Sequence, residues 1–319
     1  MSVKAPRTVK SGKCRPREAG AKVAIRTVTP SSYVVEMVSA APSEFAQSFF
    51  LASDVHWDNA HSDQDLFLKH LAQMRDRDGY WMLNGDFLCL MQGSWDPRKS
   101  MSACRPEHKV DDYLDAVIRT AADALAPYAD RLLMYAPGNH ETAILKRHNS
   151  NMVERLVQAL KVRNPACKAV AASYANFVTF RVTNPGGHTV GNPVVMYAHH
   201  GYGGGGPVTR GTIQTARMAV YLPDAHLVWT GHTHDEWRLP IERWRLSARG
   251  FPYSDRAVHF RTAGYKDEFS PQNGWAIERG HPPKPKGGAW LRLFGDRTQA
   301  PHSIDSTRWA VRYEVTEAI

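Results

Sequence analysis

The chain has 319 residues, of which 43% are hydrophobic, and a formal net charge of +9, as expected of a soluble protein with one large or two small domains. No uninterrupted apolar stretch reaches the roughly 20 residues that a membrane helix needs, and the N-terminus lacks the apolar core of a signal peptide. We therefore expect a cytoplasmic protein without membrane association, whose four scattered cysteines form neither disulfides nor a structural zinc site.

Most of the positive charge lies at the N-terminus, where residues 1–30 contain eight basic residues and one acidic residue. Residues 1–42 are predicted to be a basic, disordered arm, followed by one domain over residues 43–319. The arm is also suited to binding nucleic acid or another polyanion. A transit peptide is a further alternative, although Pro6, Pro16 and Gly20 disfavour an amphipathic helix.

After the arm, short apolar runs alternate with amphipathic segments, which predicts an α/β fold. Strands are expected over residues 48–52, 80–83, 131–135, 174–182, 193–197 and 225–229. Helices are expected over residues 66–74, with Ser62 or Asp63 as the cap, and over residues 111–126, 150–162 and 211–221.

A polar motif follows five of these strands. The motifs are Asp54-Val55-His56, Gly85-Asp86, Gly138-Asn139-His140-Glu141, His199-His200-Gly201 and Gly231-His232-Thr233-His234. In open α/β sheets, ligands bind at the carboxyl ends of the strands. Carboxylates, an amide and imidazoles form the mixed O/N ligand set that holds a pair of divalent metal ions for phosphoryl chemistry. The five motifs in this order therefore predict a metal site.

The C-terminal part, residues 236–319, is rich in Arg and Trp, and segments 257–263, 289–294 and 308–315 read as strands. We expect this part to complete the second sheet and to form a cap. Its tryptophans and arginines are predicted to pack on the sheet, with stacking on nucleic-acid bases as the alternative.

With these motifs, residues 46–265 resemble the calcineurin-like metallophosphoesterases, and in particular the compact members common in bacteria and phages. The resemblance implies a four-layer α/β/β/α sandwich of two mixed sheets, the metallo-dependent phosphatase fold. It also implies a hydrolase that binds two divalent metal ions, Mn, Fe or Zn, with Mn favoured.

The resemblance also implies a role for each motif. Asp54, His56 and His234 would bind the first metal, and Asp86 would bridge both. The second metal would be held by Asn139, His232 and His200, with His199 as the alternative to His200. These ligand assignments are carried over from the family pattern onto the matching positions of this sequence.

His140 would act on the substrate rather than on a metal, by protonating the leaving oxygen or stabilising the phosphoryl charge. Glu141 would orient His140. The nucleophile implied by the resemblance is a hydroxide that bridges the two metals and attacks phosphorus in line.

Two positions near the motifs depart from the family pattern or add to it. Cys89 stands where the family often has a polar or acidic residue, which is expected to alter hydrogen bonding near the metals without removing one. Asp58 is an additional carboxylate, interpreted either as a turn residue or as a partner of the ligands.

The segment after the fourth motif is a candidate substrate-binding region. Gly203 and Gly204 belong to a glycine run that could form an anion nest or simply a flexible loop. Arg210 and Arg217 could contact substrate phosphates or lie on a solvated helix.

The leading hypothesis is a phosphodiesterase that acts on a nucleotide or nucleic acid, with nuclease action as its sharper form. The alternative is a phosphomonoesterase acting on proteins or small esters. A third hypothesis is a non-catalytic, metal-stabilised scaffold that binds nucleic acid through its arm. The sequence does not predict the oligomeric state.

Overall fold

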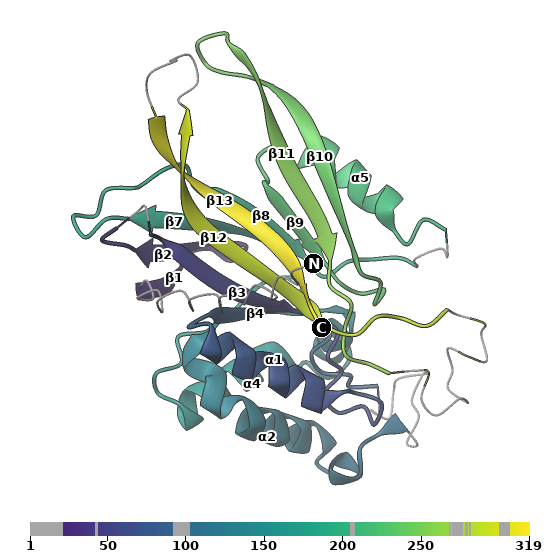
Figure 1. Ribbon diagram of the computed structural model, residues 1–319. Coiled ribbons are helices and arrows are strands. Elements are labelled where there is room, and N and C mark those ends of the chain that lie inside the picture. The colour runs from purple at the N-terminus through teal and green to yellow at the C-terminus, as the bar shows by residue number, and fades with distance from the viewer. Residues whose placement is uncertain are drawn as a thin grey trace, which may run out of the picture.

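Two mixed β-sheets face each other in the computed structural model of the protein (Figure 1). The structure describes residues 22–41, 44–91, 103–204, 208–267, 269, 277, 280, 282–299 and 307–319. Its coarse architecture is the predicted one, an α/β fold with two mixed sheets. No helix among these residues is both long and apolar enough to span a bilayer.

The larger sheet has seven strands. In spatial order they are β1 (Lys22–Thr29), β2 (Ser32–Val38), β7 (Ala175–Thr183), β8 (Val194–His199), β9 (Leu227–Thr230), β11 (Pro252–Arg261) and β10 (Trp237–Leu246). Strands β8, β9 and β11 are parallel neighbours, whereas β1–β2, β7–β8 and β10–β11 pair antiparallel. The parallel neighbours β8 and β9 therefore end at the same edge of the sheet.

The smaller sheet has six strands. In spatial order they are β13 (Thr307–Ala318), β12 (Gly288–Gln299), β3 (Ala46–Ala52), β4 (Tyr80–Asn84), β5 (Leu132–Ala136) and β6 (Val170–Ala171). Strands β3 to β6 are parallel, and β12 and β13 add an antiparallel edge. The parallel strands β3, β4 and β5 thus end at the same edge of the sheet, and one of the first three motifs follows each of them.

Alternating apolar side chains explain how the sheets are covered. On β3, Phe49 and Leu51 pack in the core between the sheets, and Phe50 and Ala52 pack in the core under the helices. This two-sided burial is expected of a strand with both faces covered. Phe49 meets Phe180 of β7 across the interface, with ring centroids 5.1 Å apart.

Helices cover the outer faces of the two sheets (Figure 1). They are α1 (Gln64–Asp76), α2 (Tyr113–Leu125), α3 (Asn139–His148), α4 (Met152–Arg163) and α5 (Thr212–Tyr221). The helices α1, α2 and α4 share one core with the smaller sheet. Helix α5 packs through Met218 on Val228 of the larger sheet. Short 3-10 helices, η2 (Pro106–His108) and η3 (Ala126–Arg131), flank α2.

The predicted arm is shorter than expected, because residues 22–38 form β1 and β2 of the larger sheet. Tyr33, Val35 and Met37 alternate into the core between the sheets, so these residues gain the burial that orders the segment. In the sequence, the basic residues Lys22 and Arg26 made this segment resemble the rest of the arm. In the structure they occupy the exposed face of β1. The rest of the predicted arm, residues 1–21, lies outside the described part of the chain.

The C-terminal part is divided between the two sheets rather than completing one of them. Strands β10 and β11 extend the larger sheet, whereas β12 and β13 join the smaller sheet, with Leu51 opposite Ala289. Leu291 and Leu293 of β12 fill the core between the sheets, which favours this pairing. The described residues of 236–319 form these strands and their loops rather than the expected cap, and most of 268–281 lies outside the described part.

Candidate metal centre

The five predicted motifs meet where the carboxyl ends of the parallel strands of both sheets come together. At this edge the backbone turns sharply, and five motif residues adopt a positive φ, a conformation uncommon for residues other than glycine. They are Asp54 (54°), His56 (53°), Asp86 (50°), His232 (77°) and His234 (54°). Such conformations cost about 1–3 kcal/mol each and concentrate at functional sites.

The first group of potential metal ligands comprises Asp54, His56 and His234, whose donor atoms lie within 4.8 Å of one another. The Asp54 Oδ1 atom lies 3.4 Å from His234 Nε2. The Nε2 atoms of His56 and His234 lie 3.3 Å apart. Asp54 is completely buried and also accepts hydrogen bonds from Ser53 Oγ at 2.5 Å and from the His232 backbone N–H at 3.0 Å.

The second group comprises Asp86, His200 and His232, again with donor atoms within 4.8 Å of one another. His200 Nε2 lies 3.0 Å from Asp86 Oδ2 and 3.9 Å from Asp54 Oδ1, so His200 connects the two groups. Its Nδ1 atom is 2.8 Å from the carbonyl of Asn84, which leaves Nε2 to face the carboxylates.

The geometry favours His200 over His199 as a ligand. His199 lies outside both groups, and its Nδ1 atom accepts a hydrogen bond from the backbone N–H of Gly201 at 2.9 Å. Its ring packs among Tyr174, Tyr197 and Tyr202. His199 therefore supports the loop that follows β8.

The donors fit divalent metal ions. Buried carboxylates need positive charge nearby, and the groups within ion-pair distance of Asp54 and Asp86 include the imidazoles of His200, His234 and His140. In addition, Asn139 Oδ1 and His232 Nδ1 are buried without a hydrogen-bond partner among the described residues. An unsatisfied buried polar atom costs about 1–3 kcal/mol, and coordination of a metal would satisfy both.

The pKa values of these groups follow from the same crowding of charges. Burial acts to raise the pKa of Asp86, but the imidazoles of His140 and His200 outweigh burial and hold it well below its usual value. Burial acts to lower the pKa of His200, but Asp86 and Asp54 outweigh burial and raise it to about 9. Burial likewise acts to raise the pKa of Asp54, but His200 and His234 outweigh burial and lower it, so the two carboxylates stay ionised and attract cations.

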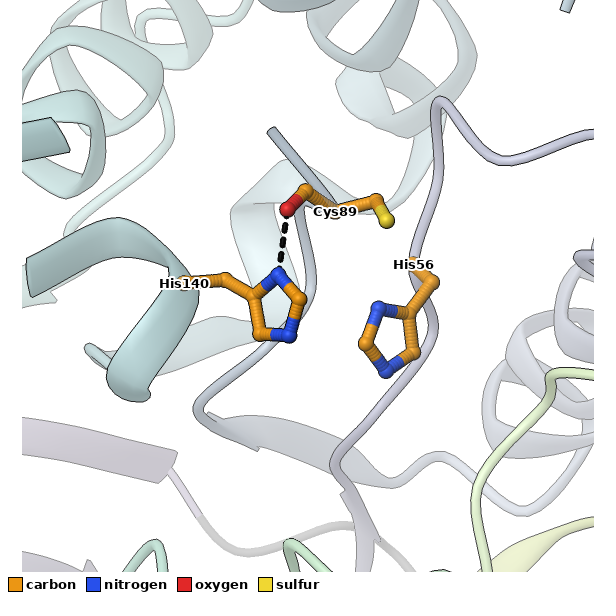
Figure 2. Close-up of side chains that lie close together, drawn as sticks. All are labelled: His56, Cys89 and His140. Carbon is orange, nitrogen blue, oxygen red and sulfur yellow. Dashed lines mark hydrogen bonds between the residues drawn. The ribbon is translucent and has the colours of Figure 1, made fainter. Parts of the chain in front are cut away.

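His140 lies beside the second group without belonging to it. Its Nε2 atom is 3.7 Å from Asp86 Oδ2, its backbone N–H donates to Asp86 Oδ1 at 2.9 Å, and its Nδ1 atom bonds to the carbonyl of Cys89 (Figure 2). Burial acts to lower its pKa, but Asp86 and the Cys89 carbonyl raise it to about 10. The imidazole is thus fixed on one side and turned toward the carboxylates on the other.

Glu141 does not orient His140, which corrects the sequence-based expectation. Its carboxylate accepts hydrogen bonds from the backbone N–H groups of Asp86 and Leu88, both at 3.0 Å, and of Gly138 at 2.8 Å. The Tyr135 hydroxyl donates to it as well, at 2.7 Å. Glu141 occupies the N3 position of α3, from which a carboxylate reaches back to the free N–H groups at the helix start. It therefore joins the second and third motifs.

Asp58 is a partner of the loop that holds His140. Its completely buried carboxylate accepts hydrogen bonds from the backbone N–H groups of Cys89 at 2.7 Å and Leu90 at 2.9 Å, and from the Tyr113 hydroxyl. Since the Cys89 carbonyl contacts His140, Asp58 fixes the position of His140 through the backbone.

Two glycines of the motifs allow the chain segments to approach closely. A Cβ atom at Gly231 would lie 2.5 Å from Asp54 Oδ2, and one at Gly138 would lie 2.5 Å from the backbone nitrogen of Asp86. Both distances are shorter than van der Waals contact, so a side chain at Gly231 would displace the Asp54 carboxylate and one at Gly138 would displace Asp86.

Arg261 at the end of β11 is a site residue that the sequence analysis missed. It is buried, donates to Thr233 Oγ1 at 2.6 Å and to the Arg210 carbonyl at 3.1 Å, and lies over the Trp237 ring. Arg261 thereby fixes the loop between His232 and His234. One arginine in an arginine-rich segment gives no sequence signal for this role.

None of the contacts described above connects the side chains of the predicted substrate-binding residues to the proposed metal ligands. Gly203 and Gly204 are exposed, and residues 205–207 of the glycine run lie outside the described part of the chain. Arg210 is exposed and has a positive φ of 46°, and its carbonyl accepts hydrogen bonds from Trp237 and Arg261. The contribution of Arg210 to the fold is therefore made by its backbone.

A third cluster of potential ligands was not expected from the sequence. His56, Cys89 and His140 each offer a donor atom, all within 4.8 Å of one another, and all three residues are buried. In Figure 2 the carbonyl of Cys89 is joined to His140 by a hydrogen bond, and the sulfur of Cys89 lies on the side of His56. Cys89 is a free thiol.

Comparisons with known proteins do not assign a family. No protein-family model matches the chain, and no curated protein matches it. Among solved structures, the chain is similar to one described as "GAP50 the anchor in the inner membrane complex of Plasmodium". The identity is 11%, the alignment covers 84% of this chain and 89% of that chain, and the TM-score is 0.35.

Proposed function

We propose that the protein is a dimetal phosphoester hydrolase with the four-layer fold of the calcineurin-like metallophosphoesterases. The proposal rests on the proximity of two groups of potential ligands at one edge of the two sheets. These groups are Asp54–His56–His234 and Asp86–His200–His232. Each group combines one carboxylate with two imidazoles, a set that suits Mn, Fe or Zn.

In this proposal the first metal is held by Asp54, His56 and His234. The second is held by His200, His232 and the amide oxygen of Asn139, and Asp86 contributes to both. Two such ions clamp a phosphate ester, activate water and stabilise the charge that develops on phosphorus. The positive φ values of the proposed ligands support the proposal, because backbone strain of this kind concentrates at active sites and ligand-binding sites.

His140 is the proposed proton donor to the leaving oxygen. Its Nδ1 atom is occupied by the Cys89 carbonyl, so a proton exchanged with substrate is carried on Nε2. That atom lies on the side of Asp86, next to the second group. A fixed imidazole at this place supplies general-acid catalysis worth about 10²–10⁴-fold in rate.

A phosphodiester is the proposed substrate class, with a nucleotide or nucleic acid as the natural example. The support is the charge of the N-terminus, since residues 1–21 contain six basic residues and one acidic residue. A positive segment next to a catalytic domain raises the local concentration of an anionic polymer. Phosphomonoester hydrolysis at the same centre is the competing activity, and a metal-stabilised scaffold without activity is the competing class.

Hydrolysis of aryl phosphates by the Mn²⁺-loaded protein tests this proposal. We expect faster hydrolysis of a bis-aryl phosphate than of the mono-aryl ester, and a loss of about 10²-fold or more in His140→Asn. His188→Asn, at an exposed histidine, is the matched control and should keep the wild-type rate. The opposite substrate ratio would indicate a monoesterase, and hydrolysis of neither ester would argue against an enzyme.

A further inference from the structure

The cluster of His56, Cys89 and His140 lies beside the proposed metal pair but has different chemistry (Figure 2). The two groups of the pair offer oxygen and nitrogen donors, whereas this cluster offers a sulfur and two nitrogens. Thiolate and imidazole together select Zn²⁺ and other soft ions over Mn²⁺.

The donor atoms of the cluster are available for coordination. His140 Nδ1 is bonded to the Cys89 carbonyl, which leaves Nε2. His56 Nε2 faces His234, while its Nδ1 atom is buried and has no hydrogen-bond partner among the described residues. Cys89 Sγ accepts a hydrogen bond from the side-chain amide of Asn59 at 3.5 Å. An unpartnered nitrogen of a histidine that is 3% exposed, next to a buried thiol, is unexplained by packing alone.

The spacing suits a small ion. Donors around a tetrahedral zinc ion lie about 3.5 Å apart. The three donors of the cluster lie within 4.8 Å of one another, so closing the site shortens any donor separation by at most about 1.3 Å. Three protein donors leave a fourth position for water.

We propose that His56, Cys89 and His140 form a third, inhibitory metal site that takes Zn²⁺ or a similar soft cation and discriminates against Mn²⁺. Coordination uses the Cys89 thiolate, His140 Nε2 and His56 Nδ1. Binding would release the thiol proton of Cys89, the Nδ1 proton of His56 and the proton that His140 otherwise carries on Nε2.

Occupation of the site would stop turnover because it removes the free nitrogen of His140. This consequence rests on the proposed function, in which His140 protonates the leaving oxygen. The binding of the ion itself does not rest on that function, so the two claims can be tested separately.

The binding test uses Co²⁺ as a spectroscopic substitute for Zn²⁺, added to the Mn²⁺-loaded full-length protein. A thiolate-to-cobalt charge-transfer band should appear in the wild type and be lost in Cys89→Ser. Cys167→Ser is the matched control, because Cys167 is also buried and free but lies outside the cluster, and it should keep the band. A band of equal strength in Cys89→Ser, or no band in the wild type, would overturn the proposal.

The inhibition test compares Zn²⁺ with Mn²⁺ added in excess over two equivalents. We expect Zn²⁺ to lower the rate of the wild type at least tenfold, and the concentration needed to rise at least tenfold in Cys89→Ser. Equal Zn²⁺ sensitivity of the two proteins would contradict an inhibitory role. A cobalt band in a protein without any hydrolysis would support the site while rejecting the proposed function.

Discussion

The Glu141 carboxylate accepts the backbone N–H of Asp86 at 3.0 Å, and this contact joins two motifs that lie 55 residues apart in the sequence. The same carboxylate holds the N–H groups of Leu88 and Gly138. The turn that presents Asp86 and the start of α3, which presents Asn139 and His140, are therefore one hydrogen-bonded unit. With the Tyr135 hydroxyl, the Glu141 carboxylate accepts hydrogen bonds from four donors, so we assign it a structural role in the centre and not that of a metal ligand.

Glu141→Gln should destabilise the protein and loosen the centre. An amide has one acceptor oxygen and would turn an NH₂ group toward backbone N–H donors, leaving buried donors unpaired at a cost of about 2–4 kcal/mol. Urea unfolding gives the stability, and metal analysis should show weaker Mn²⁺ binding. Glu154→Gln, at an exposed position of α4, should unfold like the wild type. Equal stability of the two variants would show that the Glu141 contacts are energetically unimportant.

Asp58→Asn should impair catalysis while leaving substrate binding intact. The substitution weakens the hydrogen bonds to the N–H groups of Cys89 and Leu90, which fix the carbonyl that holds His140. We expect kcat to fall about tenfold with KM nearly unchanged, because the misplaced group acts in the transition state. The control is Asp76→Asn, at an exposed position of α1. An increase in KM alone would contradict the positioning role.

Gly231→Ala should weaken metal binding by the group of Asp54, His56 and His234. The added Cβ atom would meet Asp54 Oδ2 at 2.5 Å inside a fully buried site, so the carboxylate has no free space into which to move. We expect a loss of Mn²⁺ affinity of at least tenfold, measured by equilibrium dialysis. In Gly186→Ala the nearest atom is Asn184 Oδ1, 3.3 Å away on an exposed loop, and affinity should be unchanged. Normal Mn²⁺ binding by Gly231→Ala would disprove this packing argument.

His70, which is not one of the proposed metal ligands, should make the stability of the protein depend on pH. Burial lowers the pKa of His70 below 6.5, and its Nδ1 atom lies 2.8 Å from the Tyr265 hydroxyl. Below pH 6.5 His70 is protonated in the unfolded chain, whereas burial disfavours its protonation in the folded protein. The contribution of neutral His70 to the free energy of unfolding is therefore fully present above pH 6.5 and is lost as the pH falls.

The effect of His70 is isolated by comparing unfolding free energies between pH 7.5 and 5. The wild type should lose up to about 1.4 kcal/mol per pH unit relative to His70→Gln below the unfolded pKa. His188→Gln, at an exposed site, should follow the wild type. Parallel pH profiles for the wild type and His70→Gln would rule out the buried histidine as the cause.

Much of the fold could be predicted because its signals are local. The apolar runs that end before Asp54, Asp86 and Asn139 became β3, β4 and β5, and the amphipathic segments became α1, α2, α4 and α5. Helix α3 was not predicted, because its first turn consists of the polar residues Asn139, His140 and Glu141. Strand β10 was not predicted either, since its alternate residues are exposed and charged, as in Arg243 and Arg245.

The candidate site was predicted where donor residues share a motif, and missed where contacts cross the chain. The spacing of Asp54 and His56 suggested their grouping, the family resemblance implied that His234 joins it, and the fold brings the donor atoms of all three within 4.8 Å of one another. The role of Glu141 depended on which N–H groups the end of β4 leaves free. The proximity of Cys89 to His56 follows from a turn fixed by Asp58, which no sequence periodicity reveals.

The proposed dimetal centre is tested most directly by the number of Mn²⁺ ions bound per chain, determined by equilibrium dialysis and elemental analysis. We expect about two ions in the wild type and a loss of at least one in Asp86→Asn, because Asp86 belongs to the second group and is proposed to contact both metals. Asp76→Asn should keep two. A wild-type protein that binds no Mn²⁺, Fe²⁺ or Zn²⁺ at these residues would show that they do not form a metal centre.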